Sequence, residues 1–114
     1  LRYPAYPLTH NWHYCGVGYF MAYDEFMQAS LAAAAKQSGN PTWSAPPSDT
    51  GGVNAHPSDG NFFSGGYKGA YGNFFLNWYS GVLLQHAQDV LQVAQSTIGR
   101  HVALAAKVSG GHWW

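Results

Sequence analysis

The clearest pattern along the chain is the alanine-rich stretch DEFMQASLAAAAKQS at residues 24–38. Alanine has the highest helix propensity of all residues, and the stretch contains neither Pro nor Gly. Asp24 and Glu25 stand in a first turn, where negative charge is favoured, and Lys36 stands in the last turn, where positive charge is favoured. Gly39 follows in the place of a C-cap. The pattern predicts a helix over this stretch.

A second helical pattern begins where Asn73 can serve as an N-cap and ends near Gly99. Apolar side chains recur in it at spacings of three and four residues, which puts them on one side of a helix. The positions on this side are Phe75, Tyr79, Val82, Leu83, His86, Val90, Leu91 and Ala94. We expect the helix to bury this side against neighbouring elements.

A short, nearly continuous apolar run, VALAA, occupies residues 102–106. In a protein that combines helices and strands, such a run favours a strand buried on both faces. Residues 1–20 are rich in aromatic side chains and show no sustained period, so we expect an ordered loop there. Residues 39–72 hold four of the six Pro and most of the Gly, which predicts a long irregular connection.

The order loop, helix, long loop, helix, strand and loop indicates the α/β class, as a piece of a parallel barrel or of a doubly wound sheet. One strand cannot form a sheet, and a complete barrel takes about 250 residues. The 114-residue chain should therefore be incomplete on its own. It also starts without Met and finishes on Trp113 and Trp114, so we interpret both ends as cuts.

Composition narrows the classes of partner. Five Lys and Arg residues balance five Asp and Glu residues, so the composition gives no excess of basic residues to neutralise phosphates, and we do not expect nucleic acid as a partner. No apolar run approaches the roughly 18 residues that span a membrane. Aromatic residues reach 17% against 9% charged, and large rings suit a core or a surface on which sugars stack. The single Cys15 cannot close an intrachain disulfide, so the cysteine count fits a reducing compartment and a secreted protein equally well.

The acidic side chains fit structural roles better than catalysis. Glu25 is the only Glu in the chain, and with Asp24 it fits helix capping and the helix dipole. Asp49 and Asp59 follow Ser in turn-like segments, where an Asx turn is the expected role. The sequence therefore supplies no pair of opposed carboxyl groups of its own.

The segment HNWHYC places His10, His13 and Cys15 at a short spacing that can bind zinc. A structural zinc site normally has four ligands, however, and the sequence holds no second cluster. Cys15 as a nucleophile would need an activating base that the sequence does not identify. We expect no metal and no cofactor.

Three stretches carry a resemblance to a known family: LRYPAYP at residues 1–7, FFLNWYSGVLLQH at 74–86 and KVSGGHWW at 107–114. The segment YDEFMQASLAAAA and the NPTW that follows it also match, in the same order and at similar separations. Together they resemble the plant and algal β-amylases of glycoside hydrolase family 14 over the whole chain. The resemblance implies a segment of a (β/α)8 TIM-type barrel. It also implies inverting hydrolysis of α-1,4-glucosidic bonds from non-reducing ends of starch, releasing β-maltose.

The resemblance implies that both catalytic carboxyl groups lie outside this chain. In the family, a Gly-Pro-Ala-Gly-Glu motif with the general acid directly precedes the segment that resembles LRYPAYP, and the general base lies on a later strand. We expect the general acid just before Leu1 and the general base after Trp114. The implied binding partners are starch and maltooligosaccharides, and plastid or cytoplasm would both fit the resemblance.

Five residues are predicted to bind the glucan. Lys107 and His112 match the family's glucan-binding Lys and His, and they follow the predicted strand at the end where such barrels build their active sites. An ammonium donates hydrogen bonds and a neutral imidazole can donate and accept. Arg2, Tyr6 and Trp12 lie in the loop that lines the cleft in the family, where rings can stack on glucose.

Two departures from the family pattern support a competing interpretation. Tyr19 stands where the family has an acid, and Gly111 stands where it usually has a branched apolar residue. The alternative to the enzyme is therefore a non-catalytic family member that binds glucan or acts as a regulator, because a fold can persist after its chemistry is lost. A free-standing carbohydrate-binding module is disfavoured by the helical pattern.

Overall fold

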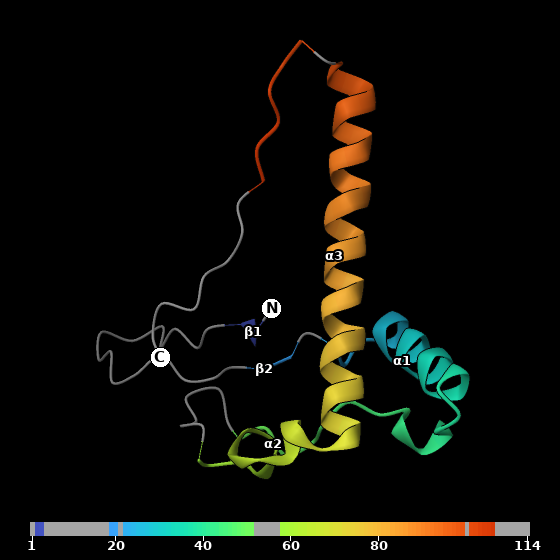
Figure 1. Cartoon of the computed structure of the whole chain (residues 1–114), viewed down its shortest axis with the longest axis vertical. Helices are drawn as coiled ribbons and strands as arrows, with labels where there is room; N and C mark the ends of the chain where they lie inside the picture. Colours follow the sequence, from blue (N-terminus) through green and yellow to red (C-terminus); the bar gives the residue numbers. More distant parts are fainter. Residues whose placement is uncertain (1, 4–18, 21, 52–57, 100, 107–114) are drawn as a thin grey trace.

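The computed structural model of the chain describes residues 2–3, 19–20, 22–51, 58–99 and 101–106. In chain order the elements are β1 (Arg2–Tyr3), β2 (Tyr19–Phe20), α1 (Glu25–Gln37), η1 (Pro41–Trp43), α2 (Asn61–Ser64), η2 (Gly66–Lys68) and α3 (Ala70–Ile98), where η marks a 3-10 helix. The long helix α3 has α1 at its side and α2 near its N-terminal end (Figure 1). The described part of the chain is therefore mainly helical.

Helix α1 follows its sequence pattern closely. The carboxylate of Asp24 accepts hydrogen bonds from the backbone N–H groups of Phe26 and Met27, both at 3.0 Å, and so caps the first turn. At the other end Ser38 is the C-cap, and Gly39 follows with a φ of 78°, a conformation that favours glycine. The predicted helix and the terminating role of Gly39 are confirmed.

Helix α3 begins earlier than predicted. Its N-cap is Gly69, so Asn73 already lies inside the helix. The side-chain amide of Asn73 donates to the carbonyl oxygens of Lys68 and Gly69, at 2.9 and 3.1 Å. The prediction of Asn73 as the N-cap is wrong, because the chain enters the helix directly from η2 and the amide joins these two elements. The predicted end is confirmed, since Ile98 is the last helical residue and Gly99 caps it with a φ of 80°.

The connection between α1 and α3 is more regular than the sequence indicates, since its described parts contain η1, α2 and η2. Two hydrogen bonds join these parts. The backbone carbonyl of Asp49 accepts from the N–H of Phe62 at 3.0 Å, and its carboxylate accepts from the N–H of Asn61 at 3.2 Å. Gly60 permits this approach, because a Cβ there would lie 2.7 Å from the backbone nitrogen of Gly51.

Two tyrosine hydroxyls fasten the same connection to the long helices. Tyr23, just before α1, donates to the carbonyl of Pro47 at 2.7 Å, and Tyr71, in α3, donates to the carbonyl of Ala45 at 2.7 Å. Burial, together with the neighbouring Tyr23, raises the pKa of Tyr71 from 10.0 to about 12. The Tyr71 hydroxyl therefore stays protonated, and able to donate, well into the alkaline range.

An aromatic core forms where the N-terminal half of α3 meets α1, α2 and β2. The buried side chains that make up this cluster are Phe20, Ala22, Leu31, Phe62, Phe75 and Tyr79. Phe63 and Phe74 are partly buried and pack against the cluster. Both pairs of adjacent Phe residues, Phe62 with Phe63 and Phe74 with Phe75, therefore act as apolar anchors of this core.

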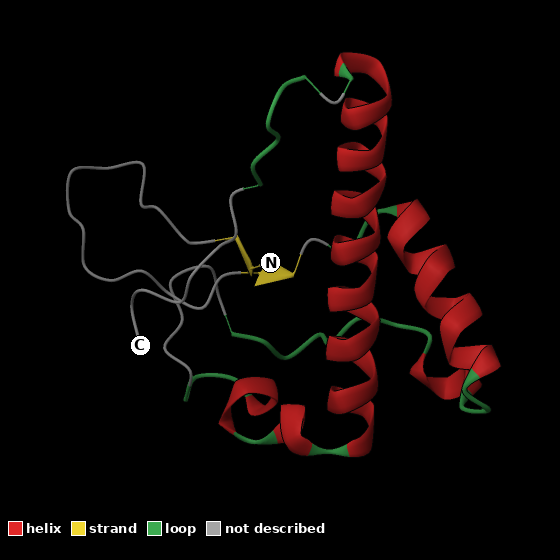
Figure 2. Ribbon diagram, turned by 45° about the horizontal axis from the view of Figure 1, so that its top comes forward, coloured by secondary structure: helices red, strands yellow, loops and turns green. Residues whose placement is uncertain are grey.

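The C-terminal half of α3 stands clear of α1 and α2 (Figures 1 and 2). Of the side that was expected to be buried, Phe75 and Tyr79 are buried, whereas Val90 is 52% and Leu91 37% exposed. Burial of this side is thus confirmed only toward the N-terminal end of the helix. Among the described residues, no helix combines the length and the apolar character needed to cross a lipid bilayer.

Residues 101–106 turn back after α3 and form no strand (Figure 1). All six residues are exposed, with Val102 at 53% and Leu104 at 40%. The predicted strand at 102–106 is wrong in this structure, because a strand buried on both faces needs neighbouring strands and none flanks this run in the described part. The sheet described here consists of β1 and β2 alone, so the predicted α/β arrangement is not formed by the described residues.

Replacing Gly72 by Ala should destabilise the protein. A Cβ at this position would lie 2.4 Å from the Cα of Tyr67 and 2.5 Å from the carbonyl oxygen of Gly66, and such overpacking costs about 1–3 kcal/mol. Gly81, in the same helix, is the matched control, because nothing lies within 4 Å of a Cβ there. Gly81→Ala should stabilise by about 0.5–1 kcal/mol. Urea denaturation measures both changes, and equal effects of the two substitutions would contradict the close contact at Gly72.

Candidate functional site

The described part of the N-terminal region is a pair of short antiparallel strands. Arg2 in β1 pairs with Phe20 in β2, and Tyr3 pairs with Tyr19. Backbone pairing of this kind holds the two ends of the intervening segment side by side. The segment that carries Tyr6 and Trp12 therefore starts and finishes at one point of the fold.

Phe20 fixes this point to the aromatic core. Its side chain is 3% exposed, and its ring meets those of Phe75 at 4.9 Å, Tyr79 at 5.3 Å and Phe62 at 5.6 Å between centroids. All three contacts are edge-to-face, with interplanar angles of 82–85°, which is a favoured geometry for aromatic pairs. The base of the predicted binding loop is thus held by side chains from α2 and α3.

The other predicted glucan-binding residues are not placed by the structure. Tyr6, Trp12, Lys107 and His112 lie outside the described residues, and of Arg2 the strand pairing alone is described. The glucan-binding roles of these five residues therefore stay predictions.

The possible zinc ligands His10, His13 and Cys15 also lie outside the described residues. Within the residues that are described, no group of three or more His, Cys, Asp or Glu side chains could hold a metal ion.

The acidic side chains of the described part have structural roles or face solvent. Asp24 caps α1, as predicted. Glu25 is exposed in the first turn of the same helix, where the helix dipole favours an acid. The carboxylate of Asp49 was expected to serve an Asx turn, but it accepts from a backbone N–H 12 residues further along, at Asn61. The carboxylates of Asp24 and Asp49 therefore bind backbone N–H groups.

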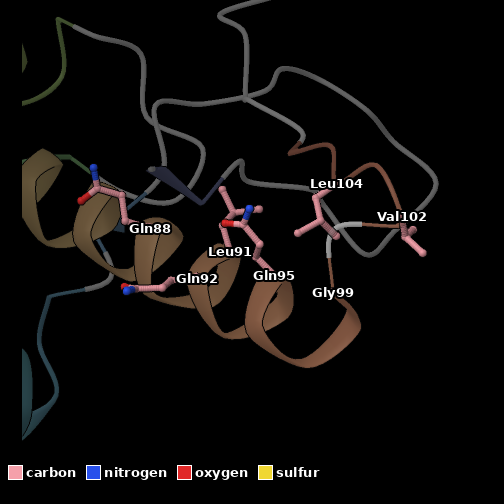
Figure 3. A pocket seen from close by; sticks show the side chains of 7 residues that line it. All are labelled: Gln88, Leu91, Gln92, Gln95, Gly99, Val102 and Leu104. Carbon is pink, nitrogen blue, oxygen red and sulfur yellow. The ribbon is translucent and has the colours of Figure 1, made fainter.

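A groove of about 670 Å³ lies next to the segment that leads to Lys107. Figure 3 shows that three glutamines of α3 line it on one side and the residues after α3 on the other. Its lining residues are Gln88, Leu91, Gln92, Gln95, Gly99, Val102 and Leu104. Amide side chains both donate and accept hydrogen bonds, and Leu91 adds an apolar surface, so this groove can hold a polar molecule.

The sequence reasoning missed these glutamines. Gln88, Gln92 and Gln95 recur at spacings of four and three residues, which places them along one side of a helix. This spacing is visible in the sequence itself. Their proximity to Val102 and Leu104 depends on how the chain turns after Gly99, which helix periodicity does not predict.

Comparison with known proteins places the chain among the glycosyl hydrolases. The sequence profile of glycosyl hydrolase family 14 matches residues 1–114. The chain belongs to this family, which confirms the resemblance seen in the sequence.

The relatives of the chain are named as β-amylases. It is 43% identical to β-amylase 2, chloroplastic, of Arabidopsis thaliana over 116 aligned residues. The aligned region covers 100% of this chain and 21% of the relative. The chain is 41% identical to β-amylase Tri a 17 of Triticum aestivum and 42% identical to a β-amylase of Glycine max, each time over 100% of this chain and 23% of the relative. The chain thus spans between a fifth and a quarter of the length of these relatives.

Replacing Phe20 by Ala should strongly destabilise the protein, because the removal of a buried, well-packed ring would leave a cavity where β2, α1, α2 and α3 meet. Such changes cost about 3–5 kcal/mol. Phe26 is 78% exposed, so Phe26→Ala is the matched control and should change the free energy of unfolding by less than about 0.5 kcal/mol. Thermal and urea denaturation measure the difference. A Phe20 variant as stable as the Phe26 variant would mean that β2 is not anchored by this ring.

Proposed function

We propose that the protein is a β-amylase, which hydrolyses α-1,4-glucosidic bonds of starch from non-reducing ends and releases β-maltose. The observation that carries the proposal is the identity of 41–44% to relatives named β-amylase along 99–100% of this chain. Identity spread over the whole length favours a shared fold and a shared cleft more than one short motif would. The substrate would be starch or maltooligosaccharides.

In this proposal the chain forms part of a (β/α)8 barrel. Two apolar surfaces of the described residues support this architecture. Leu84 and Val93 of α3 are 65% and 64% exposed, and the apolar run at residues 102–106 is exposed throughout. A helix and a strand of a barrel would cover such surfaces against each other and against the neighbouring strands.

The reaction requires two carboxyl groups on opposite sides of the bond that is cut. One donates a proton to the leaving glycosidic oxygen, while the other takes a proton from a water molecule that attacks the anomeric carbon from the opposite face. In inverting enzymes these groups lie about 6.5–9.5 Å apart, which leaves room for the water. Asp24 and Asp49 serve backbone capping in this chain, so the proposal assigns the reaction to two Glu residues that flank it.

The role of the chain itself is to bind and position the glucan. The pairing of β1 with β2 and the burial of Phe20 give the segment that carries Tyr6 and Trp12 a fixed base. The rings of these two residues would stack on glucose. Lys107 and His112 would donate hydrogen bonds to sugar hydroxyls. No metal or cofactor takes part in this chemistry.

The test of the proposed function is maltose release by the complete protein. Soluble starch should yield maltose, and NMR of the fresh product should show the β-anomer, because direct attack by water inverts the anomeric carbon. Release of the α-anomer would contradict the inverting reaction. Starch binding without any release of maltose would favour the alternative, a non-catalytic glucan-binding or regulatory member of the family.

Lys107→Ala and His112→Ala should each impair starch hydrolysis in the complete protein. A lost hydrogen bond costs about 0.5–1.5 kcal/mol, and more where the donor is charged. We expect Lys107→Ala to lower kcat more than His112→Ala does, because a charged donor holds a distorted sugar ring more firmly. Steady-state kinetics on maltopentaose separate kcat from KM.

Lys36→Ala and His101→Ala are matched controls, because both residues are exposed, at the end of α1 and after α3. They should leave kcat/KM at the wild-type value, and thermal melts should show all four variants folded. Wild-type kcat/KM in both the Lys107 and the His112 variant would remove these two residues from the site.

A further inference from the structure

A second groove, of about 430 Å³, lies between the connection that follows α1 and the elements that precede α3. The connection crosses from α1 toward α2 near the N-terminal end of α3 (Figure 1). The residues that form the walls of the groove include Thr42, Trp43, Pro47, Asp49, Phe62 and Tyr71. None of them is among the five residues predicted from the sequence to bind glucan.

The walls of this groove are held by hydrogen bonds between segments that are distant in the sequence. The hydroxyls of Tyr71 and Tyr23 donate to the carbonyls of Ala45 and Pro47, both at 2.7 Å. Across the groove, the carbonyl of Asp49 accepts from the N–H of Phe62. A groove held in this way is largely preorganised, so a ligand need not order it on binding.

The floor and the rim of the groove differ in character. Pro47 and Phe62 are buried and give an apolar floor. The Trp43 ring is half-buried and is held by Phe74 at 5.2 Å and by Tyr71 at 6.3 Å between centroids. This ring is therefore fixed against α3 and still reaches the groove.

Polar groups surround this apolar surface. Thr42 and Ser48 are exposed and offer hydroxyls, and Asn61 offers an amide. The carboxylate of Asp49 uses Oδ2 to accept from the backbone N–H of Asn61 at 3.2 Å, which leaves Oδ1 to accept from a ligand hydroxyl. A ring with an apolar face and hydroxyls at its edge matches this arrangement, and a glucose unit is such a ring.

We propose that this groove binds a glucosyl unit of an α-glucan, with the apolar face of the sugar on Trp43 and its hydroxyls on Asp49 and the rim. The choice of an α-glucan rests on the proposed function, whereas the sugar character rests on the groove itself. The size is adequate, because pockets for small molecules span about 300–1,000 Å³. The groove in Figure 3 is larger but has no aromatic ring in its lining, so it offers no comparable stacking surface.

The experiment measures adsorption of the complete protein to starch granules. Asp49→Asn keeps an oxygen for the N–H of Asn61 but removes the charge, and it should weaken adsorption about tenfold, as the loss of a hydrogen bond to a charged group does. Trp43→Phe keeps an aromatic ring against Phe74 but reduces the stacking surface, and it should weaken adsorption about threefold. Circular dichroism melts check that each variant is folded.

Asp89→Asn is the matched control, since Asp89 is an exposed acid on α3 outside the groove and its substitution removes the same charge. It should adsorb like the wild type. If Asp49→Asn proves unstable, Ser48→Ala provides a second probe, because this exposed hydroxyl lies on the rim.

Wild-type adsorption of the folded groove variants would overturn the proposal, and so would equal weakening by Asp89→Asn. The proposed function is read separately, as maltose release from maltopentaose by the wild-type protein. A wild type that releases maltose, together with groove variants that adsorb normally, would reject the groove alone. A wild type that releases none would reject the activity, while reduced adsorption of the Asp49 variant would still support the groove.

Discussion

The described fold depends on the placement of one aromatic ring, that of Phe20. Edge-to-face contacts join it to Phe62, Phe75 and Tyr79, so a single side chain connects β2 with α2 and α3. Ala22 and Leu31 complete the cluster from the side of α1. Edge-to-face pairs are stabilised beyond the burial of their area, because the positive ring edge meets the negative ring face. Without this ring β2 would lose its aromatic contacts with α2 and α3, and only pairs such as Phe62 and Phe75, at 6.1 Å, would still join those two helices.

Burial is uneven along α3, because its N-terminal half packs into the core and its C-terminal half is mostly exposed. Near the N-terminal end, Gly72 lets the helix approach η2 closely, and Phe75 is fully buried. Beyond Leu83 most of the apolar side chains are exposed, and glutamines line the groove beside Val102 and Leu104. Apolar surfaces that extend this far commonly mark an interface with other protein. In the proposed barrel, this half of the helix would be covered by neighbouring elements.

The connection between α1 and α3 has a structural role and also forms a possible binding surface. Hydrogen bonds from Tyr23 and Tyr71 hold it against the long helices, and contacts of Asp49 close it onto α2. Because the carbonyls of Ala45, Pro47 and Asp49 are hydrogen-bonded within the protein, Trp43 and the carboxylate of Asp49 keep defined positions. The rigidity that stabilises this irregular segment is the same property that would allow it to recognise a sugar.

The sequence by itself determined the features that depend on neighbours within one or two turns. The Asp24 cap, the end of α1 at Gly39 and the end of α3 at Gly99 are all local features. The resemblance to the family is likewise carried by three short motifs. Only the tertiary structure decided the start of α3, because that start depends on the packing of η2 against Gly72. The tertiary structure also decided that residues 102–106 form no strand, since a strand needs neighbouring strands to hydrogen-bond its backbone N–H and C=O groups. The groove at Trp43 could not be predicted from the sequence either. It depends on contacts between distant segments, such as the hydrogen bond from Tyr71 to Ala45, which lie 26 residues apart.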